Sequence, residues 1–150
     1  IGIKTDFIKL AGEINSSIPT KILNKINNIF KTKNIKNIKI LILGIAYKKN
    51  VNDLRESPGI KILDLLLKKK YKVKYSDPLI SKIPRLRNFK LNLKSIKLNS
   101  KNIRKFDLVI LTTDHDVFNY KLIYNSSKLI LDTRGVYRKD KDKKVIYNFH

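Results

Sequence analysis

Short, almost entirely apolar runs alternate along this chain with segments whose apolar residues recur every three or four positions. Runs of the first kind are typical of strands buried on both faces, and segments of the second kind are typical of amphipathic helices. Their alternation predicts an α/β fold in which a mostly parallel sheet is covered by helices on both faces. We expect strands at residues 38–43, 72–75, 107–112, 128–131 and 145–147, and helices at 57–69 and 120–126.

Residues 1–34 predict an N-terminal helical segment that precedes the α/β domain, which we place at residues 35–150. Pro19 interrupts this segment, and proline removes a helical hydrogen bond, so we expect a kink there or a second helix that starts near Ser16 or Ser17. The segment's apolar stripe would pack on the following domain, on a missing domain or on a second subunit. The stripe consists of Phe7, Leu10, Ala11, Ile14, Ile18, Ile22, Ile26 and Ile29.

Residues 79–103 are the part of the chain that the pattern describes least well. Leucines and isoleucines are separated there by lysine and asparagine. Such spacing is compatible with a strand or with an irregular excursion. We assign no chemistry to this segment.

One stretch combines a strand end, a basic loop and a helix start. The apolar run at 39–43 ends in a glycine, a loop with Lys48, Lys49 and Arg55 follows, and a Ser-Pro pair at 57–58 signals the next helix. Backbone N–H groups at a helix start carry partial positive charge, so the added cations suit a phosphate or a carboxylate. An ordinary connection with solvated basic residues fits the spacing equally well.

Parallel strands end at one edge of the sheet, and open α/β sheets bind ligands at that edge. The loop with Lys48, the turn at 112–115 and Arg134 all follow expected strand ends. We therefore expect them to converge. Several cations in a fixed array could bind a diphosphate through charge-assisted hydrogen bonds.

Three further features have both a chemical and a structural interpretation. His115 could act as an acid or a base, but a lone histidine in a turn is more often structural. Asp77, after the second strand, could bind a ribose hydroxyl or form an Asp-Pro turn. Asp53 and Glu56 form a carboxylate pair on the basic loop, for which ion pairs with the loop's own cations are favoured over acid–base catalysis.

The chain carries 34 lysines and arginines against 12 aspartates and glutamates, a formal net charge of +22. This charge predicts attraction to polyanions and favours, as an alternative function, a basic α/β module that binds nucleic acid. The lysines are nevertheless spread over the whole sequence, and no helix-turn-helix, zinc or RNA-recognition signature is present. Nucleic acid is therefore the less favoured partner.

The sequence contains no cysteine, so these residues offer no disulfide, thiolate metal site or cysteine nucleophile. No run approaches a membrane span and no leader pattern is present, so we expect no membrane partner and a cytoplasmic protein. Five glycines cannot form a Gly-x-Gly-x-x-Gly fingerprint after the first strand, which predicts a Rossmann-like fold without the dinucleotide loop. The start at Ile1 and the lack of methionine indicate the C-terminal part of a longer protein.

A longer motif spans the basic loop. It reads Gly44-Ile45-Ala46-Tyr47-Lys48-Lys49 and, three residues later, Asp53-Leu54-Arg55-Glu56-Ser57-Pro58. This motif resembles the signature that opens the C-terminal domain of nucleotide-sugar dehydrogenases, the UDP-glucose/GDP-mannose dehydrogenase family. Within it the chain is most similar to the UDP-N-acetylhexosamine 6-dehydrogenases. The resemblance implies that Lys48 and Arg134 contact the UDP-sugar substrate and that Arg55 reaches NAD held by an N-terminal domain.

The same resemblance implies a four-electron oxidation of the sugar's C6 hydroxyl to a carboxylate, with two NAD and a thioester on a cysteine. Because the chain has no cysteine and no glycine-rich NAD domain, we expect residues 35–150 to be the nucleotide-sugar-binding domain, inactive alone. NAD would be bound mainly by a domain absent from this chain. Residues 1–34 would end the central helical dimerisation region of a homodimer that serves polysaccharide precursor synthesis. An inactive remnant of a split gene is a further hypothesis.

Overall fold

The computed structural model describes residues 2–147, with side-chain surroundings for Asp6 and residues 17–146. Five parallel strands form one sheet in the order β2-β1-β3-β4-β5. They confirm every predicted strand with small shifts at the ends, and the sheet is parallel throughout. The strands are β1 (Lys39–Leu43), β2 (Lys72–Ser76), β3 (Leu108–Leu111), β4 (Ile130–Asp132) and β5 (Val145–Tyr147).

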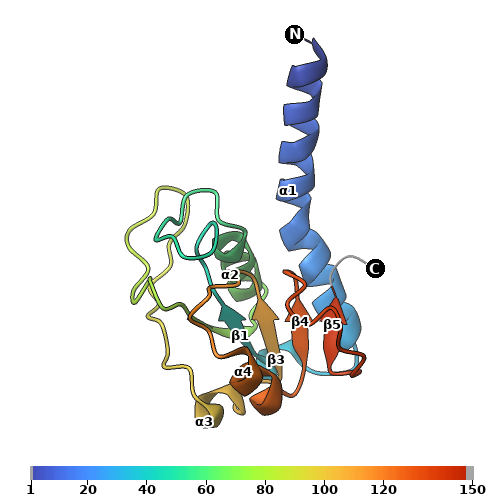
Figure 1. Ribbon diagram of the computed structural model, residues 1–150, viewed down its shortest axis with the longest axis vertical. Coiled ribbons are helices and arrows are strands. Elements are labelled where there is room, and N and C mark those ends of the chain that lie inside the picture. Colours follow the sequence, from blue (N-terminus) through green and yellow to red (C-terminus); the bar gives the residue numbers. More distant parts are fainter. Residues whose placement is uncertain (1, 148–150) are drawn as a thin grey trace.

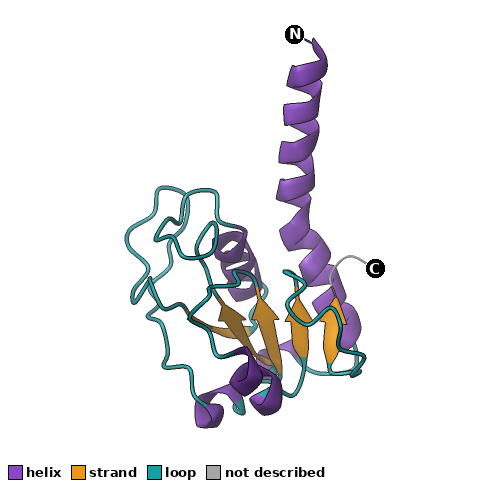
Figure 2. Ribbon diagram, in the orientation of Figure 1, coloured by secondary structure: helices purple, strands orange, loops and turns teal. Residues whose placement is uncertain are grey.

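Helices cover both faces of the sheet, as the sequence predicts (Figure 2). Alternate residues of β1 point into the two layers, because successive strand residues face opposite sides. Ile40 and Ile42 pack in the layer under α1 and α2, whereas Leu41 and Leu43 pack in the layer under α3 and α4. The helices are α1 (Gly2–Ile29), α2 (Pro58–Lys68), α3 (Ser100–Ile103) and α4 (Tyr120–Ser126), with a 3₁₀ turn at Ile35–Asn37.

α1 is one helix that runs through Pro19, and its first turns extend beyond the α/β body (Figure 1). Of the two alternatives that the sequence leaves at Pro19, the second helix that starts near Ser16 or Ser17 is therefore wrong. Proline costs about 3 kcal/mol in a helix interior, but Ile22 and Ile26 are buried in the core beside α2, and this packing holds the helix together. No helix in the described part of the chain could span a membrane. Four residues of the predicted stripe lie outside the described side chains: Phe7, Leu10, Ala11 and Ile14.

The segment between β2 and α3 follows the open edge of β2. An antiparallel bridge joins Lys82 and Lys94. The Ile96 N–H donates to the Tyr75 carbonyl at 2.9 Å, and the buried Tyr75 hydroxyl donates to the Ile80 carbonyl at 2.9 Å. Burial raises the pKa of that hydroxyl to about 12, so it stays a donor at neutral pH. The segment is thus the irregular excursion that the sequence allows, and the short helix α3 at its end was not predicted.

The helix start predicted at Ser57-Pro58 is confirmed. The Ser57 hydroxyl accepts the Ile60 N–H at 3.3 Å, as an N-cap does, and donates to the Ile45 carbonyl. A Cβ on Gly59 would lie 2.9 Å from the Ile45 Cα. The first turn of α2 therefore fits tightly against the end of β1.

Gly44 lets the chain turn at the end of β1 close beside β3. Its φ of +78° lies in the left-handed region, and a Cβ there would lie 2.4 Å from the Thr113 carbonyl oxygen. Gly135 has a similar φ of +76°, but a Cβ on it would meet nothing within 4 Å. The two glycines share their backbone conformation and differ in the space around them.

We expect Gly44→Ala to lower the free energy of unfolding more than Gly135→Ala. Both substitutions introduce left-handed strain of about 1–2 kcal/mol, and Gly44→Ala adds a clash, for which overpacking costs about 1–3 kcal/mol. Urea unfolding of both variants and the wild type measures the difference. Equal losses would contradict the close approach of the β1 loop to the β3 turn.

Candidate functional site

The strand arrows in Figure 1 end at one edge of the sheet, because all five strands are parallel. The strand order reverses between β1 and β3, and in open α/β sheets ligands bind beyond the carboxyl ends at such a point. The loop with Lys48 follows β1, the turn at 112–115 follows β3, and Arg134 follows β4. All three sequence-predicted segments therefore start at this edge.

A buried carboxylate joins the ends of three strands. Asp77, directly after β2, accepts the Ile45 N–H at 2.8 Å, the Leu79 N–H at 2.9 Å and the Nε2 group of His115 at 3.0 Å. The Nδ1 atom of His115 accepts the Asn50 N–H at 2.9 Å. Both side chains are fully buried. Asp77 thus forms the turn that the sequence allows, with protein donors on both carboxylate oxygens, and His115 has the structural role that its position favours.

Asn50 fastens the tip of the β1 loop to the β3 turn. Its Nδ2 group donates to the Asp116 carboxylate at 2.7 Å, and its Oδ1 atom accepts the Asp116 N–H at 3.0 Å. The Lys49 ammonium lies 3.4 Å from the same carboxylate. The hydrogen bond from Asn50 and the charge of Lys49 lower the pKa of Asp116. The sequence analysis missed Asn50 and Asp116, which stand 66 residues apart and show no local signal.

The two predicted site residues of the β1 loop, Lys48 and Arg55, are exposed. Arg55 donates from Nε and Nη2 to the two oxygens of Asp53 at 3.1 Å each, and its side chain is 90% exposed. Hydrogen bonds from Arg55 lower the pKa of Asp53, and the charge of Lys48 adds to this effect. Lys48 itself is exposed and has no ion pair among residues 17–146. The predicted carboxylate pairing within the loop is confirmed for Asp53, whereas Glu56 pairs with Lys61 of α2 at 3.4 Å.

Arg134 stands on a loop that another buried carboxylate holds. Asp132, the last residue of β4, accepts the N–H groups of Arg134 at 2.9 Å and of Gly135 and Tyr137 at 2.8 Å each. The Arg134 Nε group donates to the Asp114 carboxylate in the β3 turn at 3.1 Å. This contact ties the β4 loop to the β3 turn. The sequence analysis missed Asp132, although an aspartate at a strand end before a turn is a signal for such backbone bonds.

A cavity of about 970 Å³ lies between the β1 loop and residues 84–89. Its lining includes Tyr47, Arg55 and Arg87. Neither of the other two predicted site residues lines it. One wall therefore comes from a segment to which the sequence analysis assigned no chemistry.

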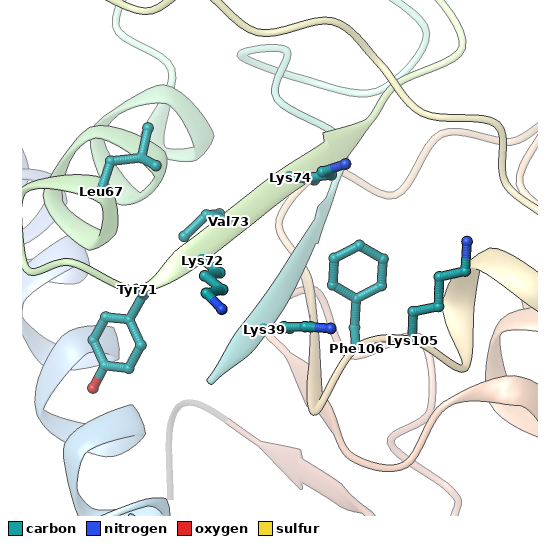
Figure 3. Close-up of a pocket in the computed structure, with 8 residues that line it drawn as sticks. All are labelled: Lys39, Leu67, Tyr71, Lys72, Val73, Lys74, Lys105 and Phe106. Carbon is teal, nitrogen blue, oxygen red and sulfur yellow. The ribbon is translucent and has the colours of Figure 1, made fainter. Parts of the chain in front are cut away.

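An apolar groove of about 430 Å³ lies at the opposite, amino-terminal edge of the sheet (Figure 3). It opens beside the first residues of β1 and β2, a strand's length away from the loops described above. None of its lysines has an ion pair in the described part of the chain. Its apolar lining comes from Leu67, Tyr71, Val73 and Phe106, and the lysines are Lys39, Lys72, Lys74 and Lys105.

The turn after β1 does not fit a dinucleotide. In a Rossmann turn, glycines let the backbone approach the pyrophosphate at a helix start. Here Thr113 packs directly against Gly44, and the helix start carries Pro58 under the Ser57 cap. Among the described residues there is also no group of three side chains that could hold a metal ion.

An open parallel sheet in this order, covered by helices on both faces, is a doubly wound α/β fold, in which ligands bind at the carboxyl edge of the strands. Residues 41–139 match the sequence profile of the UDP-glucose/GDP-mannose dehydrogenase family, UDP binding domain. The chain belongs to this family. The resemblance and the fold predicted from the sequence are both confirmed.

The curated relatives that match this chain are also nucleotide-sugar dehydrogenases. UDP-N-acetyl-D-mannosamine dehydrogenase of Methanococcus vannielii is 32% identical over 140 residues, which cover 87% of this chain and 30% of that protein. UDP-glucose 6-dehydrogenase of Rickettsia prowazekii is 28% identical over 158 residues, which cover 99% of this chain and 35% of that protein. The chain thus spans about a third of the length of these relatives.

Solved structures share the fold. The UDP-N-acetyl-mannosamine dehydrogenase of Staphylococcus aureus is 26% identical, with a TM-score of 0.66 over 90% of this chain and 31% of that chain. A UDP-D-ManNAc dehydrogenase from Pyrococcus horikoshii reaches a TM-score of 0.71 at 21% identity, over 93% of this chain and 32% of that chain. The second likeness shows the fold alone.

Proposed function

We propose that this chain is the UDP-sugar-binding part of an NAD-dependent nucleotide-sugar 6-dehydrogenase that oxidises a UDP-N-acetylhexosamine to its uronic acid. The match to the family's UDP binding domain over residues 41–139 carries the proposal, because it includes the loops after β1, β3 and β4. The relatives' names differ in the sugar. Identity is higher to the UDP-N-acetyl-D-mannosamine dehydrogenase than to the UDP-glucose enzyme, which supports a UDP-N-acetylhexosamine.

Lys48 and Arg134 are the proposed contacts to the diphosphate. The Lys48 ammonium is exposed on a loop whose tip is fastened, so little order must be gained on binding. Asp114 holds Arg134 through Nε alone, which leaves the terminal guanidinium nitrogens for an anion. Each charge-assisted hydrogen bond contributes about 1.5–3 kcal/mol.

Arg55 is the proposed contact to NAD, which accepts hydride in the overall reaction and would be held by another domain. Asp53 fixes the direction of the guanidinium, and the exposed Nη1 group is left for that contact. The misfit of the turn after β1 to a dinucleotide supports a cofactor held mainly elsewhere.

Residues 1–34 are the proposed end of a helical dimerisation region. Figure 1 supports this, because the first turns of α1 extend away from the α/β body. The complete enzyme would act as a homodimer in the cytoplasm and serve polysaccharide precursor synthesis.

The groove at the amino-terminal edge favours a second candidate function, the binding of nucleic acid. Its four lysines gather on one surface without ion pairs in the described structure. Polyanion binding by such a surface would weaken steeply as salt rises. UDP-sugar binding at the opposite edge would saturate at one site and depend on Lys48.

We expect UDP to bind this chain saturably and Lys48→Ala to weaken binding about 10- to 100-fold, the loss of one charge-assisted hydrogen bond. Isothermal titration calorimetry at physiological salt measures both affinities. Lys72→Ala is the matched control, since it removes the same charge from an exposed lysine at the opposite edge. Equal weakening by the two substitutions, or binding of DNA but not UDP, would favour the second candidate.

We expect this chain alone to produce no NADH from NAD and a UDP-hexosamine, because its 150 residues contain no cysteine for a thioester. NADH absorbance over time measures turnover. The same sample must bind UDP in the calorimeter, so that inactivity is not mistaken for misfolding. Appreciable turnover would contradict the proposal that catalysis needs a cysteine and an NAD-binding domain outside these 150 residues.

A further inference from the structure

We propose that His115 is a positioning residue for UDP-sugar binding: its neutral imidazole, with the proton on Nε2, holds the loop that presents Lys48. The proposal rests on the proposed function, because it takes Lys48 as a contact to the nucleotide-sugar. Beyond the proposed function, the proposal names His115 as the residue that positions Lys48, and it requires the His115 ring to be neutral with its proton on Nε2.

The hydrogen bonds of His115 fix one tautomer. The Asn50 N–H points at Nδ1 from 2.9 Å, so Nδ1 is an acceptor and carries no proton. The proton of the neutral ring is then on Nε2, which donates to the Asp77 carboxylate at 3.0 Å. The same carboxylate oxygen accepts the Ile45 N–H at 2.8 Å and is thereby held in place. The imidazole is a fixed link between the end of β2 and the loop after β1.

The hydrogen bond from the Asn50 N–H to His115 holds the loop segment that carries Lys48. Asn50 stands two residues further on and has a φ of +62°, in the left-handed region. Residues other than glycine keep this conformation where other contacts support it. Here the supports are the backbone bond to His115 and the side-chain bonds to Asp116. Without an acceptor at position 115, the Asn50 N–H loses its partner, and only the contacts to Asp116 still hold the loop.

Charged and titratable groups face His115 from several elements. Asp77 faces Nε2 from the end of β2, Asp116 follows on the same turn, and Lys49 of the β1 loop pairs with Asp116 at 3.4 Å. From α4, the Tyr120 hydroxyl donates to the His115 carbonyl at 2.6 Å. A second proton on the ring would sit on Nδ1 and face the backbone N–H of the β1 loop, donor against donor. The loop must then move away.

Two substitutions test the hydrogen bonds of the two His115 ring nitrogens separately. His115→Asn keeps an acceptor near the Nδ1 position for the Asn50 N–H, whereas His115→Gln keeps a donor for Asp77 and offers the loop no acceptor. Calorimetry uses a UDP-hexosamine, whose diphosphate is a diester and does not titrate near neutral pH. We expect His115→Asn to bind within about threefold of the wild type and His115→Gln at least about tenfold more weakly.

A control variant is the second readout. His150→Ala removes the chain's other histidine and should bind a UDP-hexosamine like the wild type. A His115→Asn variant that binds as weakly as His115→Gln, or a His115→Gln variant that binds like the wild type, overturns the proposal.

A measurement without ligand separates this proposal from the proposed function. Long-range proton–nitrogen NMR of the unliganded chain should show the His115 proton on Nε2 alone at neutral pH. A proton on Nδ1 overturns the positioning role even if the chain binds a UDP-sugar. With the expected tautomer, absence of UDP-hexosamine binding overturns the proposed function and the role of His115 with it.

Discussion

The loops at the carboxyl edge of the sheet depend on a buried carboxylate. A carboxylate without water needs hydrogen-bond donors on its oxygens, and Asp77 finds them in Ile45, Leu79 and His115, which belong to three different strand ends. Satisfying one charge therefore brings the ends of β2, β1 and β3 together. Asp132 does the same for the loop after β4 with three backbone N–H groups. The buried carboxylates of Asp77 and Asp132 thus fix the backbone at this edge. The side chains of Lys48, Arg55 and Arg134 are exposed.

This arrangement suits the recognition of a diphosphate. The loops are held before a ligand arrives, so less conformational freedom is lost on binding. Arg55 and Arg134 are each directed by a carboxylate and remain accessible, and Lys48 stands on a loop fastened at its tip. The match of residues 41–139 to the family's UDP binding domain fits the proposed role of these loops.

Much of the fold could be predicted from the sequence because it is encoded locally. Apolar runs indicate the strands, and a Ser-Pro pair indicates the start of α2. The sequence could not decide whether α1 continues through Pro19 or a second helix starts there, since packing of the residues beyond the proline outweighs its own preference. At the candidate site, the motif and the end of β1 indicate Lys48, and the end of β4 indicates Arg134. The contacts of Asp77 with His115 and of His115 with Asn50 span 38 and 65 residues, and no local pattern reports them.

We propose that the loops after β1, β3 and β4 together form one site for a UDP-sugar. The most direct test is a titration of the isotope-labelled chain with a UDP-hexosamine, followed by NMR of the backbone amides. We expect saturable shifts grouped at residues 44–50, 112–116 and 132–135, with the amides of Lys39 and Lys72 unchanged. Shifts grouped at the amino-terminal edge, or no saturable shifts, would contradict it.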